Sequence, residues 1–115
     1  MSCGSMDIWT FINMLRSKAI SEIIFTKHCK WRLSQRGFRE EDIMKLLGDK
    51  RRLRGIFQQK EDRFMLCYEH PTNRDLDVIL ILDVKHIKSK LRVVVVTVFP
   101  QPSRKRTKVI EDEED

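Results

Sequence analysis

The sequence predicts a single α+β domain in which N-terminal helices pack on one face of a four-stranded antiparallel sheet. Apolar residues before position 48 recur with the period of a helix, whereas those after position 50 follow the period of extended strands. Helices gathered at the start of a chain and strands at its end are typical of this class and argue against alternating βαβ units. A chain of 115 residues, 41% of them hydrophobic, is sufficient for one core.

The first helix is expected over residues 7–21. Asp7 can cap its N-terminus, because a carboxylate at that position accepts hydrogen bonds from free backbone N–H groups. The apolar residues that follow are spaced three and four apart, as on one face of a helix. They are Ile8, Phe11, Ile12, Leu15 and Ala19. Residues 23–25 then form a short β-branched and aromatic step before the next helix.

Two shorter helices follow, each with start and stop signals. Thr26 can cap a helix over residues 27–36, and Gly37 supplies its C-terminal stop. A third helix is expected over residues 40–47, where three acidic residues in the first turn complement the helix dipole. Gly48 ends this helix.

The second half of the chain predicts four strands, separated by loops rich in Asp, Asn, Pro, Lys and Ser. They are expected at residues 51–57, 63–69, 78–84 and 91–99. The last two are apolar on both faces, so we place them in the middle of the sheet. The first two are more polar and suit its edges.

Charge and composition narrow the classes of function. The net charge is +6 although the last five residues are all acidic, and a cationic body suits a polyanion such as RNA or DNA. The alternative is that the excess of Lys and Arg only keeps a small domain soluble. The chain has no apolar run of membrane-spanning length and no signal-type start. We therefore expect a cytoplasmic protein without membrane contact.

Domain boundaries follow from the same composition. Residues 1–5 precede a second methionine and are interpreted as a leader, of natural or cloning origin. Residues 6–102 form the expected domain. Residues 103–115 consist of a basic run followed by an acidic run, a pattern typical of a disordered tail.

No metal or other cofactor is expected. The three cysteines, Cys3, Cys29 and Cys67, lack the spacing of a zinc site and are interpreted as reduced thiols. Asp77 and Asp83 bracket one predicted strand, so they would lie roughly 20 Å apart, too far to share an ion. We interpret them as residues that solubilise the strand ends.

The pattern with the clearest chemistry lies on the second predicted helix. His28, Arg32 and Arg36 are four residues apart, so one face presents an imidazole and two guanidinium groups. Cleavage of RNA without a metal requires a general base, a general acid and positive charge on the phosphate. Histidine exchanges protons near neutral pH, and arginine binds phosphate with two parallel hydrogen bonds. The alternative is a solvated basic face with a capping histidine.

The stretch FTKHCKWRLSQRGFREEDIMKLL, followed by strands that end in VVVVTVFP, resembles a small family of domains of unknown function. Members of that family read T-K-H-x-x-x-R-x-x-x-R-G, then an acidic-start helix, then strands ending in V-V-T-V-Y. The family is similar to the RelE/ParE-like toxins and to the wider barnase, EndoU and RelE group of ribonucleases. The resemblance covers roughly residues 23–100.

This resemblance implies a RelE-like fold and a metal-independent endoribonuclease activity. His28, Arg32 and Arg36 match the motif, and Thr97 in the last strand is a further catalytic candidate. The sequence departs from the pattern at two positions that follow the motif. Arg39 stands where the family has a capping serine, and Phe99 replaces a common tyrosine, which removes one hydroxyl that could serve as an acid.

Other side chains of the second helix suit nucleic-acid binding. Lys27 and Lys30 add charge, and Trp31 lies between two cations and can stack on a base, although core packing is the favoured use of its indole. Tyr68 is expected as a core ring rather than as a proton donor.

RNA is the expected partner, and DNA is a second one. The rival interpretation is a non-catalytic module in which the same basic face binds nucleic acid or an acidic protein such as an antitoxin. In that version the N-terminal helix mediates a homodimer.

Overall fold

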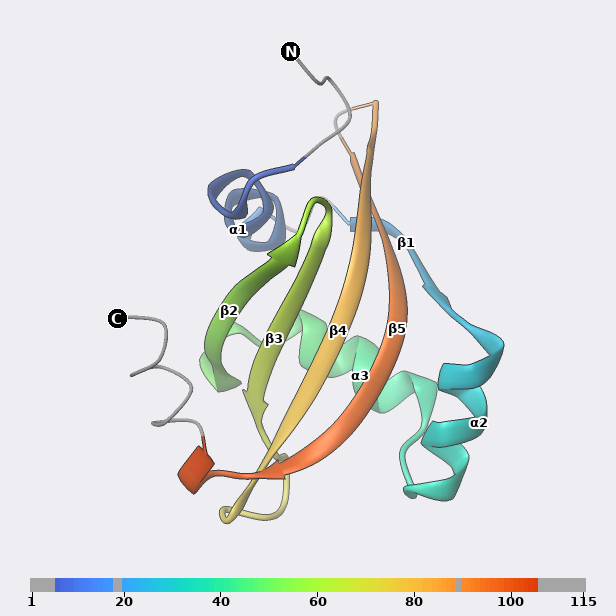
Figure 1. The fold of residues 1–115 in the computed structure, drawn as a ribbon, viewed down its shortest axis with the longest axis vertical. Helices are drawn as coiled ribbons and strands as arrows, with labels where there is room; N and C mark the ends of the chain where they lie inside the picture. Colours follow the sequence, from blue (N-terminus) through green and yellow to red (C-terminus); the bar gives the residue numbers. More distant parts are fainter. Residues whose placement is uncertain (1–5, 18–19, 89, 106–115) are drawn as a thin grey trace.

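The computed structural model describes residues 6–17, 20–88 and 90–105, and it has an α+β architecture (Figure 1). Its helices are α1 (Ile8–Arg16), α2 (Lys27–Gln35), α3 (Glu40–Gly48) and a short 3-10 helix, η1 (Lys50–Arg52). Its strands are β1 (Ile20–Phe25), β2 (Leu53–Lys60), β3 (Arg63–Glu69), β4 (Leu76–Ile87) and β5 (Lys90–Pro102). None of the described helices is long and apolar enough to cross a membrane. The expected α+β class is confirmed.

The strands form one mixed sheet in the order β1-β5-β4-β3-β2. β1 runs parallel to β5, with Ile23 opposite Val93, and the other neighbouring strands are antiparallel. The prediction of a four-stranded antiparallel sheet is therefore wrong. The short step expected at residues 23–25 is the end of a full strand, because the outer edge of β5 offers it a line of hydrogen-bonding partners.

The positions of the inner strands agree in part with the prediction. β4 and β5 each lie between two neighbours, as their apolar residues on both faces indicate. β3 also lies inside the sheet, between β2 and β4, so the edge position predicted for the two polar strands holds for β2 alone.

α1 is shorter than predicted but begins where expected. Asp7 accepts a hydrogen bond from the Thr10 backbone N–H at 2.8 Å, which confirms the cap. The helix ends at Arg16 rather than near residue 21, because the chain turns into β1. Phe11 of α1 stacks on Phe64 of β3 with ring centroids 4.3 Å apart, and this contact fixes the helix on the sheet.

The predicted signals at both ends of α2 and at the start of α3 are confirmed. The predicted stop at Gly48 is not, because α3 includes Gly48, which has no positive φ, and Asp49 follows it as the C-cap. Thr26 accepts a hydrogen bond from the Cys29 N–H at 3.0 Å, and Gly37 has the positive φ of 74° that stops α2. Asp42 in the first turn of α3 accepts a hydrogen bond from the Arg39 N–H at 3.0 Å. The acidic turn therefore satisfies a backbone donor at the position where a capping serine is missing.

The core lies between the helices and one face of the sheet, and α3 crosses behind the strands in Figure 1. Each α-helix contributes buried side chains to it, among them Phe11, Leu33 and Ile43. They pack against alternate residues of the inner strands. These strand residues include Phe64, Leu66, Leu80, Leu82, Val93 and Val95. No described helix covers the opposite face of the sheet (Figure 1).

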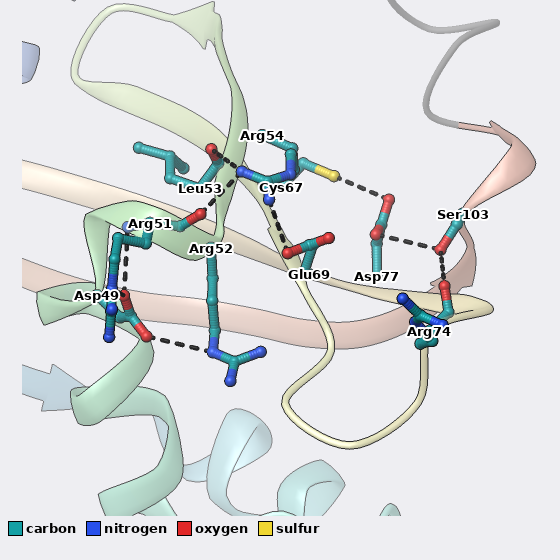
Figure 2. Close-up of polar contacts among 10 residues, drawn as sticks. All are labelled: Asp49, Arg51, Arg52, Leu53, Arg54, Cys67, Glu69, Arg74, Asp77 and Ser103. Atoms are coloured by element: carbon teal, nitrogen blue, oxygen red, sulfur yellow. Dashed lines mark hydrogen bonds and ion pairs between the residues drawn. The ribbon is translucent and has the colours of Figure 1, made fainter.

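The interpretation of Asp77 and Asp83 as solubilising residues at strand ends is wrong, because both lie within β4 and both carboxylates have partners. Asp77 is 0% exposed and accepts hydrogen bonds from the Cys67 thiol at 3.3 Å and the Ser103 hydroxyl at 3.3 Å (Figure 2). Asp83 forms a bidentate ion pair with Arg63, at 2.6 and 2.8 Å. The partners of both carboxylates come from β3 or from the chain after β5. Such contacts between separate segments cannot be predicted from sequence spacing.

The expected tail begins with an anchored residue. Ser103 donates its backbone N–H to the Asp75 carbonyl at 2.9 Å, and its hydroxyl shares one proton between the Arg74 carbonyl, at 3.1 Å, and the Asp77 carboxylate. The predicted leader, residues 1–5, and the tail from residue 106 onward lie outside the described residues.

Candidate nucleic-acid interface

α2 is held along the edge of β5, beyond the point where β1 ends. At its start, the Thr26 backbone N–H donates to the Val95 carbonyl at 3.3 Å. At its other end, the Arg36 guanidinium donates to the Val98 carbonyl. Cys29 and Leu33 are buried between these two ties, so the opposite side of the helix faces outward. The helix is thereby fixed on the sheet with one face free for binding.

The exposed face of α2 carries a tryptophan among cationic side chains. Trp31 is 56% exposed, so the core packing favoured for its indole is wrong. The His28 ring lies 6.2 Å from the Trp31 ring, and the Arg32 guanidinium carbon lies 5.7 Å from it. Lys27 and Lys30 are exposed beside them. We call these five residues, Lys27, His28, Lys30, Trp31 and Arg32, the α2 face.

The charges of the α2 face are not neutralised within the described part of the chain. The ion pairs found there join arginines of other elements to acidic residues, and none involves Lys27, Lys30 or Arg32. By contrast, Arg54 of β2 binds Glu69 at 2.7 Å, as Figure 2 shows. The α2 face therefore keeps its positive charge for an external anion.

The remaining two catalytic candidates are placed differently from His28. Arg36 is half-buried and bound to β5, so part of its guanidinium has a structural role. Thr97 lies next to a bulge, because Val95 pairs with Leu82 while Thr97 pairs with Ile81. Alternation along the strand then turns Thr97 toward the helix-free face of the sheet. No hydrogen bond among the described residues joins Thr97 to His28 or Arg32.

A second feature, which sequence spacing did not reveal, is a pocket of about 450 Å³ at the C-terminal end of α2. Two stretches distant in sequence build it: residues 36–52, which run from the end of α2 through α3 to η1, and residues 70–72 in the loop between β3 and β4. Its lining residues are Arg36, Gly37, Phe38, Asp42, Lys45, Leu46, Asp49, Arg52, His70, Pro71 and Thr72. We call it the α3 pocket.

His70 is oriented within this pocket by the backbone of its own loop. Its Nδ1 accepts hydrogen bonds from the Thr72 and Asn73 N–H groups, both at 3.1 Å, so the neutral ring carries its proton on Nε2. The ring lies 5.8 Å from that of Phe38, with the planes tilted by 51°. His70 therefore has defined partners on both sides of its ring, in the backbone of its own loop and in Phe38.

Tyr68 is a core ring, as predicted. It is 1% exposed, and its hydroxyl has no hydrogen-bond partner among the described residues. Burial, and then the charge of Asp49, raise the pKa of Tyr68, so the phenol stays protonated at neutral pH. Asp49 itself lines the pocket and binds Arg52 at 3.2 Å (Figure 2).

The cysteines and carboxylates do not gather into a metal site in the described residues. Cys29 is buried against the core, and this burial raises the pKa of its thiol. Such a thiol is a poor nucleophile at neutral pH.

Comparison of the chain with known protein families, with curated proteins and with solved structures found no significant match. The function is therefore argued from the α2 face and its surroundings.

Proposed function

We propose that this chain is an RNA-acting domain that binds single-stranded RNA through the α2 face. The observation that carries the proposal is the exposed Trp31, whose ring lies 6.2 Å from the His28 ring and 5.7 Å from the Arg32 guanidinium carbon. The neighbouring Lys27 and Lys30 form no ion pair within the described part of the chain. Proteins that bind single strands combine cationic side chains along the backbone with aromatic rings on which bases stack. Each of the two components is present on this one helix face.

The rigidity of α2 supports this use of the face. Hydrogen bonds to the Val95 and Val98 carbonyls fix the helix at both ends, so the aromatic and cationic groups keep their relative positions before RNA arrives. Preorganised side chains lose less conformational entropy on binding. The same face also suits DNA or an acidic protein segment, because charge and stacking do not by themselves select ribose.

The test is a comparison of the two tryptophans of the chain. Trp31→Ala should weaken binding of a short, labelled, single-stranded RNA by about 5- to 150-fold, because stacking contributes about 1–3 kcal/mol per base. Trp9→Ala is the matched control, since Trp9 is 73% exposed on α1, at the other end of the molecule (Figure 1). Fluorescence anisotropy measures both affinities.

Intrinsic fluorescence gives a second readout. In the Trp9→Phe variant Trp31 is the only tryptophan, and RNA should quench its emission if a base stacks on it. Equal losses of affinity in Trp31→Ala and Trp9→Ala, or RNA binding without any quenching, would contradict the proposal. Tighter binding to DNA of the same sequence would move the substrate class from RNA to DNA.

Metal-independent cleavage of the bound RNA is the second candidate function. The observation that favours it is the exposed imidazole of His28 on the same face as the Arg32 guanidinium. Cellular RNA incubated with the protein and a metal chelator should then be cleaved by wild type but not by His28→Ala or Arg32→Ala. Intact RNA in every reaction, together with a retained gel shift, would leave a binding module without this activity.

A further inference from the structure

The α2 face leads directly to the α3 pocket. His28, Arg32 and Arg36 follow one another at four-residue steps, and Arg36 is both the last of this row and part of the pocket lining. Eight residues of helix span roughly 12 Å, a distance that a short segment of a nucleic-acid strand can cover. A strand bound on the α2 face can therefore reach the pocket without leaving the protein surface.

The lining of the α3 pocket includes groups that suit a flat ring. The Phe38 and His70 rings lie 5.8 Å apart, and Leu46 and Pro71 are further apolar lining residues. Protein sites that take an unstacked base of single-stranded RNA use aromatic side chains of this kind. A pocket of about 450 Å³ also has the size of a small-molecule site.

The polar groups of the pocket include both signs of charge. Arg36, Lys45 and Arg52 are cations that can bind a phosphate group. Asp42 and Asp49 are carboxylates, which accept hydrogen bonds from N–H donors. Guanine presents two adjacent N–H donors, on N1 and on the exocyclic amino group, whereas uracil, cytosine and adenine present a single donor group on the corresponding edge. Guanine therefore fits a carboxylate best.

From this arrangement we propose that the α3 pocket binds one nucleotide of the RNA strand, with a preference for guanine. The base lies against apolar lining residues that include Phe38, an aspartate accepts its N–H groups, and the cations Arg36, Lys45 and Arg52 hold its phosphate. This inference rests on the proposed RNA binding and adds to it a site that selects a base.

The experiment uses free nucleotides, because they test the pocket without the α2 face. Titration calorimetry of the full chain should show guanosine 5′-monophosphate binding about tenfold more tightly than the uridine, cytidine and adenosine monophosphates. That ratio is the size expected of one bidentate hydrogen-bonded pair. Inorganic phosphate is titrated as a control ligand that lacks a base. If it binds as tightly as guanosine monophosphate, the pocket does not recognise the base and the proposal is overturned.

Two variants locate the binding. Thr72→Trp adds a large ring at an exposed position of the lining and should lower guanosine monophosphate affinity at least tenfold, whereas Thr10→Trp on α1 should not change it. Lys45→Ala, at an exposed lining position, should weaken binding of the nucleotide more than that of guanosine. An unchanged affinity in both pocket variants would overturn the proposal.

The same variants separate this inference from the proposed function. Trp31→Ala should leave binding of guanosine monophosphate unchanged while RNA binding falls. If RNA binding depends on Trp31 but no nucleotide binds the pocket, the pocket assignment is wrong and the α2 face keeps its role. If the nucleotide binds but RNA does not, the proposed RNA function is wrong and so is the assignment of this pocket to a strand.

Discussion

The Arg36 guanidinium donates a hydrogen bond to the Val98 carbonyl and so joins the end of α2 to β5. Hydrogen bonds that involve a charged group contribute more than neutral ones. Arg36→Ala should therefore lower the free energy of unfolding by about 1–3 kcal/mol. Urea titration followed by circular dichroism measures this free energy. Arg32→Ala is the control, and its free energy of unfolding should stay close to that of wild type. Equal stability of the two variants would show that the Val98 contact contributes nothing.

Gly37 and Gly48 make a matched pair at the ends of α2 and α3. Gly37 has a positive φ of 74°, whereas Gly48 does not, and neither has atoms within 4 Å of an added Cβ. Gly37→Ala should therefore cost about 1–2 kcal/mol of stability, from backbone conformation alone. Gly48→Ala should be neutral or should stabilise the protein by up to about 1 kcal/mol. Thermal denaturation of both variants distinguishes these outcomes, and the reverse order would contradict the assigned conformations.

The Asp83–Arg63 ion pair predicts a defined dependence of stability on pH. The hydrogen bonds from Arg63 lower the pKa of Asp83 below its ordinary value of about 3.9. The stabilisation is thus present above about pH 4 and is lost as the pH falls through the lower pKa of the folded state. The Asp83 side chain is 42% exposed, so the ion pair should contribute less than about 1 kcal/mol to the free energy of unfolding.

The Asp83→Asn variant tests this ion pair. Its free energy of unfolding should differ from that of wild type by a constant amount from pH 6 to pH 8. The difference should shrink below about pH 4, where the unfolded chain also takes up its proton. Asp75→Asn is the control, since Asp75 is exposed and has no ion pair among the described residues. A difference that grows toward acid pH would have the wrong sign for this pair.

Tyr68→Phe should not destabilise the protein. The buried hydroxyl has no partner among the described residues, so its removal eliminates an unsatisfied donor and keeps the ring. We expect a free energy of unfolding equal to wild type or up to about 1 kcal/mol higher. A loss of more than about 1 kcal/mol in urea titration would mean that this hydroxyl is hydrogen-bonded in solution.

The salt dependence of RNA binding should identify the charges that contact phosphates. For single strands, each contact contributes about 0.7 to the slope of log affinity against log salt. The double variant Lys27→Gln, Lys30→Gln should therefore reduce the slope by about 1.4. The control is a double variant, Lys85→Gln with Lys90→Gln, which removes the same charge from exposed positions on β4 and β5. Its slope should equal that of wild type. Equal slopes for the two double variants would exclude the α2 face as the phosphate-binding surface.

Local signals in the sequence were sufficient for the starts of α1 and α2, for the end of α2 and for much of the core, but not for the end of α1. Asp7 and Thr26 cap their helices, and Gly37 stops α2, because these effects depend on neighbouring residues only. The apolar runs of residues 78–84 and 91–99 correctly indicated inner strands, since an inner strand is covered on both faces. The row of His28, Arg32 and Arg36 likewise follows from helical spacing alone.

Tertiary structure decided what depends on pairing between distant segments. Residues 20–25 became a fifth strand because the free edge of β5 was there to pair with, and no local pattern encodes a parallel partner 70 residues away. Trp31 turned outward because Cys29 and Leu33 fill the buried side of α2. The burial of Asp77 and the α3 pocket also arise from contacts between separate elements. Helix caps and periodicity are thus read from neighbours in sequence, whereas exposure, partners and pockets require neighbours in space.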